Sequence, residues 1–237
     1  MSRRKLSSSY TTIDVNDTFA VTLAKRDEWS LAWFLTANEN LSTATLLYEK
    51  RRYSHSVFFL QQCVECIVKG ILIENGLIDN PRDLNHFPEE AFRDFFKMVN
   101  SSSEENCAYI DKVFSSEMDF SKRMSSAAEI VNVTYNQIKE LKNTGVGFSV
   151  SKQAYSSLGL HRCSTEENAD MRIWDIQLSQ ILLYTFGKLL NPCQQDSRYP
   201  YKSNGEIVLP AMIYDDDTAE ELGKVIQWIH YIISKII

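Results

Sequence analysis

Glycine and proline are scarce in this sequence, which has 8 Gly and 5 Pro among 237 residues. A β-sandwich or barrel needs turn residues about every eight to twelve positions, so the composition argues against both folds. Long apolar runs are also missing. No run approaches the roughly 18 uninterrupted apolar residues that a membrane span requires. Even the apolar stretch 181–190 is interrupted by Thr185, Gly187 and Lys188.

A basic surplus is absent too, because 25 Lys and Arg stand against 31 Asp and Glu, a formal net charge of −6. This balance argues against general coating of nucleic acid. The five cysteines are odd in number and scattered, which indicates reduced thiols and predicts a cytoplasmic protein. The basic start at Arg3-Arg4-Lys5 leads into no apolar segment, so we expect no secretory signal.

Hydrophobic residues make up 44% of the chain, enough for a sizeable core. The Ser- and Thr-rich residues 1–25 are expected to form a flexible N-terminal arm, and residues 26–237 one helical domain. Helical periodicity and its breaks predict helices over 27–50, 54–75, 88–99, 104–114, 126–141, 164–191 and 218–237. Residue types predict N-caps at Ser54, Ser164 and Thr218 and a C-terminal cap at Gly76. The predicted fold is all-α.

The predicted helix at 54–75 is apolar almost all round, which is typical of the central helix of a bundle. A polar stripe nevertheless occupies about a third of a turn, and it consists of Ser54, His55, Gln61, Gln62, Glu65 and Lys69. One interpretation is a solvated face with a Glu65–Lys69 salt bridge worth about 0.3–0.5 kcal/mol. The other is a polar seam that faces a cleft or a partner subunit, because buried polar groups need partners.

The run Gln61-Gln62-Cys63-Val64-Glu65-Cys66-Ile67-Val68-Lys69 resembles the Gln-Gln-x-x-Glu-x-x-x-Lys signature of the HEPN family (higher eukaryotes and prokaryotes nucleotide-binding). The preceding helix with its basic turn, His86 after the second helix, and Arg198-Tyr199-Pro200 before the last helix are also similar to that family. The resemblance covers residues 27–86 and 198–237. Residues 87–197 exceed the compact family pattern, so we interpret about 100–190 as a helical insertion before the last helix.

This resemblance implies an up-and-down helical bundle that dimerises. Members of the family include RNases that act as toxins or defence effectors, nucleotide-binding or non-catalytic modules, and partners of small nucleotidyltransferases. The RNase branch pairs an Arg, which stabilises phosphate charge, with a downstream His, which moves a proton, and four to six residues lie between the two. No His of this chain has an Arg at that spacing. Lys50–His55 and Lys224–His230 keep a cation, but Lys lacks the planar fork of Arg, so an RNase of the usual type is disfavoured.

Two basic turns mix cations with aromatic residues, a combination that suits phosphate contacts and base stacking. They are Lys50-Arg51-Arg52-Tyr53 and Arg198-Tyr199-Pro200-Tyr201-Lys202. The alternative is that both are ordinary solvated turns. If the family geometry holds, both turns border the face of Gln62, Glu65 and Lys69, whereas Arg52 and Arg198 on opposite sides would contradict this expectation.

Other motifs in the sequence are weaker. Cys63-Val64-Glu65-Cys66 has C-x-x-C spacing, but a position inside a helix favours two small buried residues over a redox or metal site. The four dispersed His predict no metal, and the sequence has no phosphate-binding glycine loop, so we expect no cofactor.

The sequence therefore predicts a cytoplasmic, HEPN-like homodimer, not associated with a membrane, that binds a nucleotide or RNA in a defence or toxin–antitoxin system. A nucleotidyltransferase-type protein is a candidate partner. The predicted ligand-binding residues are Arg52, Gln62, Glu65, Lys69, Arg198, Tyr199 and Tyr201. One alternative is a divergent, metal-independent RNase that uses Arg198 with a histidine from elsewhere, such as His86. The other is a non-catalytic dimerisation or interaction module, whose polar seam only builds the bundle.

Overall fold

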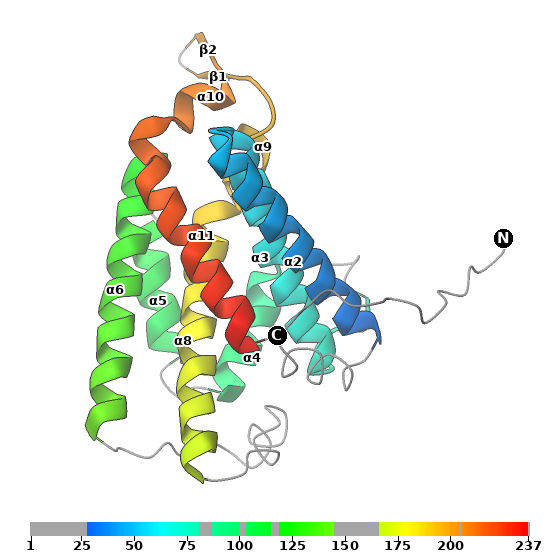
Figure 1. Ribbon diagram of the computed structural model, residues 1–237, viewed down its shortest axis with the longest axis vertical. Coiled ribbons are helices and arrows are strands. Elements are labelled where there is room, and N and C mark those ends of the chain that lie inside the picture. Colours follow the sequence, from blue (N-terminus) through cyan, green and yellow to red (C-terminus); the bar gives the residue numbers. More distant parts are fainter. Residues whose placement is uncertain are drawn as a thin grey trace, which may run out of the picture.

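The computed structural model describes residues 28–80, 87–99, 103–114, 119–144, 166–203 and 205–236. These residues are mainly helical and form a bundle with one short hairpin at its end (Figure 1). The helices are α2 (Glu28–Glu49), α3 (Tyr53–Glu74), α4 (Glu89–Val99), α5 (Ser103–Phe114), α6 (Phe120–Thr144), α8 (Glu166–Leu190), α9 (Cys193–Asp196), α10 (Pro210–Ile213) and α11 (Asp216–Ile236). The predicted all-α bundle is confirmed.

Helices α3 and α8 form the centre of the bundle. Helix α2 packs along the length of α3, and α8 contacts α3, α4, α5, α6 and α11. The buried side chains of all these helices form one continuous hydrophobic core. Helix α8 belongs to the segment interpreted as an insertion, and it supplies much of this core. The assignment of 100–190 as an insertion stays a prediction.

Helix α3 is long and apolar enough to cross a membrane by length and composition alone. However, 78% of that stretch is buried inside the bundle, as befits the core helix of a globular protein. Its close approach to α2 depends on Gly70, where an added Cβ would lie 2.8 Å from Cε1 of Phe34. The predicted central position of this helix is confirmed.

Both helices of the α2–α3 hairpin end in a Schellman motif. After α3, the N–H of Gly76 donates to the carbonyl of Ile73 and that of Leu77 to Leu72, with Gly76 at a φ of +66°. This confirms the predicted C-terminal glycine. After α2, Arg51 occupies the same left-handed position, at a φ of 54°.

Two predicted N-caps are wrong. Helix α3 begins at Tyr53 with Arg52 as the cap residue and no side-chain cap, and Ser54 lies buried inside the first turn. Helix α11 begins before Thr218, because the carboxylate of Asp215 accepts the N–H of Asp217 at 3.1 Å. Carboxylates favour helix N-termini, where free N–H groups carry partial positive charge. The predicted cap Ser164 lies outside the described residues.

Helix α6 starts earlier than predicted, and the structure contains a short hairpin that the sequence did not predict. Helix α6 begins at Phe120, several residues before the predicted start, and the Asp119 carboxylate accepts the N–H of Lys122 at 2.8 Å. Strands β1 (Tyr201–Ser203) and β2 (Glu206–Val208) form an antiparallel hairpin that pairs Tyr201 with Val208. This hairpin stands at the end of the bundle, together with α9 and α10 (Figure 1).

Candidate functional site

The polar stripe of α3 forms a hydrogen-bonded seam around Glu65. The Lys69 ammonium donates to Oε1 of Glu65 at 2.8 Å, and the Gln61 amide donates to Oε2 at 3.1 Å. The Gln62 amide donates to the Gln61 carbonyl and lies 3.5 Å from the same carboxylate oxygen. One carboxylate thus accepts from a cation and from two amides spaced along a single helix.

This seam lies inside the protein. Glu65 is 8% exposed and Lys69 5% exposed, whereas Gln62 is half-buried at the edge of the seam. The burial excludes the solvated-face interpretation for Glu65 and Lys69 and matches the polar seam. Their charges are compensated by each other, so they act first as parts of the helix packing. Direct ligand contact by Gln62, Glu65 and Lys69 stays a prediction.

Helix α2 covers the seam. The Lys69 ammonium lies 5.5 Å from the centroid of the Trp33 ring, a cation–π contact, and the Asn40 amide donates to the Cys66 sulfur at 3.8 Å. Both thiols of the C-x-x-C are buried, as expected. Burial raises the pKa of Cys66 to about 12, so this thiol stays protonated at neutral pH and is a poor nucleophile.

Beyond the N-terminal end of the seam, an exposed arginine is held by two aromatic rings. The Arg198 guanidinium lies 4.8 Å from the ring centroid of Phe58 and 5.0 Å from that of Tyr199. Its Nε donates to the carbonyl of Gln194 at 3.1 Å. Phe58 is one helical turn before Gln62 on α3, so this platform of Arg198, Phe58 and Tyr199 continues the line of the seam. Tyr199 is 58% exposed and Tyr201 38% exposed.

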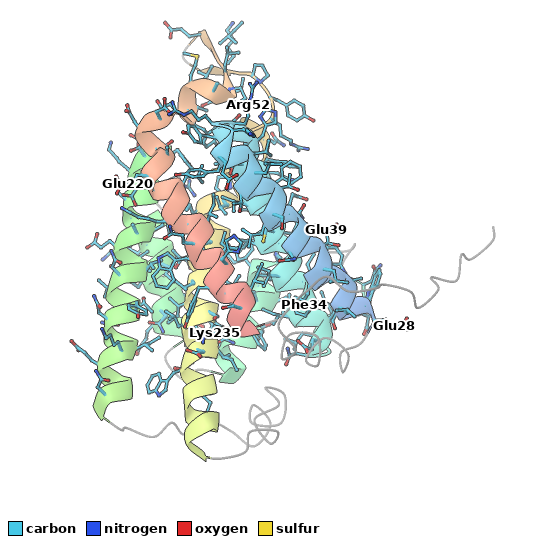
Figure 2. The ribbon with its side chains drawn as sticks, in the orientation of Figure 1. Glu28, Phe34, Glu39, Arg52, Glu220 and Lys235 are labelled. Atoms are coloured by element: carbon cyan, nitrogen blue, oxygen red, sulfur yellow. The ribbon has the colours of Figure 1, made fainter. Side chains whose placement is uncertain are left out.

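The basic turn between α2 and α3 reaches the same end of the bundle (Figure 2). Arg52 is exposed and immediately precedes α3. Arg51 pairs with Asp216 at 3.9 Å, and the Tyr53 hydroxyl donates to the same aspartate at 2.9 Å. A non-glycine residue in the left-handed conformation is uncommon. The turn therefore holds an arginine where the backbone favours glycine.

Arg52 and the platform thus both lie towards the N-terminal end of α3, while their sharing one face with Gln62, Glu65 and Lys69 stays a prediction. Helices α9 and α10, which flank the hairpin segment, both contact α3. The candidate residue His86 lies outside the described residues. The Lys–His spacing on α11 builds no such centre, because Lys224 pairs with Glu220 and Glu221 at 2.9 Å. His230 instead lies 3.4 Å from the Thr45 hydroxyl, and burial lowers its pKa.

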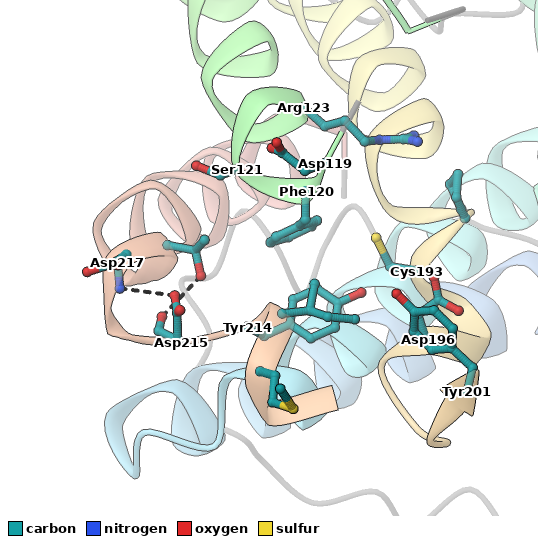
Figure 3. A pocket seen from close by; sticks show the side chains of 14 residues that line it. Asp119, Phe120, Ser121, Arg123, Cys193, Asp196, Tyr201, Tyr214, Asp215 and Asp217 are labelled. Atoms are coloured by element: carbon teal, nitrogen blue, oxygen red, sulfur yellow. Dashed lines mark hydrogen bonds between the residues drawn. The ribbon is translucent and has the colours of Figure 1, made fainter. Parts of the chain in front are cut away.

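A cavity of about 500 Å³ opens beside the hairpin, between the first turns of α6 and α11 and the helices α9 and α10 (Figure 3). Its lining includes Phe120, Arg123, Cys193, Asp196, Tyr201 and Tyr214. The Cys193 thiol donates to the carbonyl of Leu189 at 3.4 Å, and burial raises the pKa of that thiol to about 11. No sequence motif indicates this cavity, because its walls come from four separate segments.

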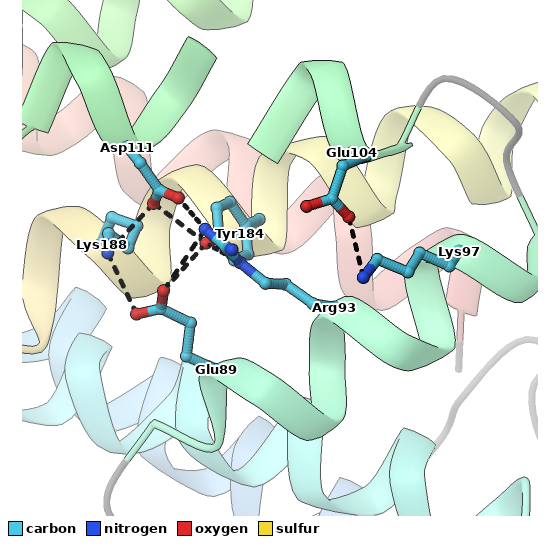
Figure 4. A network of polar contacts seen from close by, with 7 residues as sticks. All are labelled: Glu89, Arg93, Lys97, Glu104, Asp111, Tyr184 and Lys188. Carbon is cyan, nitrogen blue, oxygen red and sulfur yellow. Dashed lines mark hydrogen bonds and ion pairs between the residues drawn. The ribbon is translucent and has the colours of Figure 1, made fainter. Parts of the chain in front are cut away.

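A second polar cluster ties α4 and α5 to α8 (Figure 4). The Tyr184 hydroxyl accepts from Nε of Arg93 at 2.7 Å and lies 3.1 Å and 3.0 Å from oxygens of Glu89 and Asp111, to which it can donate. Lys188 pairs with both carboxylates at 3.0 Å and 3.1 Å, and Arg93 pairs with Asp111. Two cations and two carboxylates balance, so this cluster is a neutral tie between helices.

Comparison with known proteins identifies the first part of the chain. No curated protein and no solved structure gives a significant match. Residues 30–119 match the model of the HEPN domain. The matched segment begins in α2, ends just before α6 and includes the whole seam, whereas Arg198 lies outside it. The chain therefore carries a HEPN domain, and residues 30–119 belong to that family.

Proposed function

We propose that the protein binds a nucleotide or RNA at the end of the bundle that carries Arg198, Tyr199, Tyr201 and Arg52, without cleaving it by the usual RNase centre. The observation that carries this proposal is the held arginine. Its guanidinium is fixed by Phe58, Tyr199 and the carbonyl of Gln194. Within the described residues, its terminal nitrogens make no hydrogen bond.

A fixed guanidinium with free terminal N–H groups suits a phosphate, because its planar fork can donate two parallel hydrogen bonds. The exposed rings of Tyr199 and Tyr201 stand next to it in the chain, where nucleobases could stack. Arg52 adds a second cation at the same end. The buried seam supports this site indirectly, since it fixes the helix on which Phe58 lies.

The remaining expectations extend the proposal on the family resemblance and, for the cellular location, on the scattered cysteines. They are a cytoplasmic homodimer, a role in a defence or toxin–antitoxin system, and a nucleotidyltransferase-type partner. The held arginine supports nucleotide or RNA binding but says nothing about these three.

The test is binding of ATP and of a fluorescein-labelled mixed RNA pool, followed by fluorescence anisotropy over a salt series. Arg198→Ala should lower the affinity for one of these ligands at least tenfold and reduce the salt slope by about one phosphate contact. Arg198→Lys keeps the charge but loses the planar fork, so it should recover only part of the affinity. The matched control is Lys139→Ala, which removes an exposed cation near the C-terminal end of α6. This variant should change neither the affinity nor the salt slope.

Other outcomes would contradict the proposal. Cleavage of the RNA pool, lost in Arg198→Ala, would indicate the divergent RNase instead. A stable dimer that binds neither ATP nor RNA would indicate the interaction module. Equal salt slopes for the wild type and Arg198→Ala would show that the held arginine contacts no phosphate.

A further inference from the structure

The cavity beside the hairpin has aromatic walls. The rings of Phe120 and Tyr214 pack edge to face with centroids 4.6 Å apart, and Tyr201 lies next to Asp196 (Figure 3). Its volume of about 500 Å³ falls within the range of small-molecule sites, about 300–1,000 Å³. The cavity is therefore large enough for a compact organic ligand that lies flat against rings.

One half-buried carboxyl of the cavity wall, that of Asp196, lacks a partner among the described residues. Asp119 and Asp215 each accept a backbone N–H at the start of their helices. Asp196, in contrast, is half-buried and makes no hydrogen bond or ion pair within the described residues. Burial raises its pKa, and no neighbouring charge offsets that effect. This carboxyl is therefore partly desolvated and has no hydrogen-bond donor among the described residues.

The cation among the lining residues is turned away from Asp196. Arg123 donates through Nη2 to the carbonyl of Lys188 at 2.6 Å, and its guanidinium lies 5.6 Å from the ring centroid of Phe114. Figure 3 shows the guanidinium directed towards α8. With Asp217 also on the rim, the lining carries four carboxylates against this one guanidinium and is negative overall.

We propose that this cavity binds a small organic cation, a primary amine attached to an aromatic or apolar body. The ammonium group meets the Asp196 carboxylate, and the body lies against the rings of Tyr201, Tyr214 and Phe120, a setting that favours cations through the ring quadrupoles. A hard metal cation fits less well, because Ca²⁺ takes six to eight oxygen ligands. No group of three or more His, Cys, Asp or Glu in the described part of the chain is placed to hold a metal.

This inference goes beyond the proposed nucleotide or RNA site, with which the cavity shares Tyr201, since a negative cavity repels phosphate. The test is calorimetric titration of the full chain with phenethylamine and with its neutral analogue 2-phenylethanol. The amine should bind at least tenfold more tightly than the alcohol. Asp196→Asn should remove that difference by weakening the amine at least tenfold, and Tyr201→Ala should weaken both ligands. Asp94→Asn makes the same chemical change at an exposed position of α4 and should have no effect.

Three results would overturn the proposal. They are equal affinities for the amine and the alcohol, unchanged amine affinity in Asp196→Asn, and no heat of binding for the amine at millimolar concentration. Unfolding of Asp196→Asn in urea distinguishes loss of the site from loss of the fold. This variant should be at least as stable as the wild type, because it removes a desolvated carboxylate that has no partner.

Discussion

The buried pair of Glu65 and Lys69 offers the sharpest test of how the seam supports the bundle. Their side chains are 10% and 6% exposed, and the charged atoms are 2.8 Å apart. At an effective dielectric constant of 20, charges at that distance attract by about 6 kcal/mol, and desolvation offsets a large part of this gain. Replacing Lys69 with Met keeps most of the packing but removes the ammonium that donates to the buried carboxylate.

Removing one partner of a buried pair costs about 3–5 kcal/mol. Gln61 and Gln62 still donate to Glu65 in this variant, so we expect Lys69→Met to lie at the lower end, about 3 kcal/mol. The double variant Glu65→Gln/Lys69→Met removes both charges and keeps a carbonyl acceptor for Gln61. It should recover about 2 kcal/mol of the loss, because no uncompensated charge then remains.

The assay is urea unfolding followed by far-UV circular dichroism and by tryptophan fluorescence, to which Trp33 over the seam contributes. A cost below about 1 kcal/mol for Lys69→Met would show that the ammonium is not needed to compensate the carboxylate. A double variant no more stable than Lys69→Met would refute the reasoning as well, since the loss would then come from packing rather than from charge.

Two further predictions concern Glu89 and Arg51. Burial raises the Glu89 pKa, but the ion pair with Lys188 and the Tyr184 hydroxyl outweigh it, so the pKa lies below 4.5. The ionised Glu89 carboxylate therefore contributes its full stabilisation above pH 4.5 and loses it as the pH falls further. In urea titrations at several pH values, Glu89→Gln should reduce the loss of unfolding free energy below pH 4.5. Parallel curves of unfolding free energy against pH for the variant and the wild type would contradict this prediction. Arg51→Gly should be about 1 kcal/mol more stable than Arg51→Ala, because its φ of 54° suits glycine; equal unfolding midpoints would argue otherwise.

The errors at helix starts have a common cause. The sequence offers several candidate caps within a few residues. The capping-box spacing from Thr218 to Glu221 predicts Thr218 as the cap of α11, whereas Asp215 caps this helix. Near α6, no local pattern distinguishes Asp119, which caps the helix, from the polar residues around it. Which of several polar residues caps a helix depends on where packing starts the first turn, and that is a tertiary effect.

The candidate site divides in a similar way. Because Glu65 and Lys69 are four residues apart on one helix, the sequence alone could pair them. That they are buried under α2 follows from the packing of Trp33 and Gly70, which no local pattern contains. The contact of Arg198 with Phe58 joins distant segments of the chain. The cavity around Asp196 likewise exists only where four segments meet.

The scarcity of glycine and proline and the helical period of the apolar residues determined by themselves that this chain is an all-α bundle with α3 near its centre. Secondary structure follows from local period and propensity, which a linear sequence carries. Only the tertiary structure decided that the polar stripe is buried, that an arginine is held between two rings beside it, and that an unpaired carboxyl lines a cavity. Burial and charge compensation depend on neighbours that are remote in the chain, and folding alone brings these together.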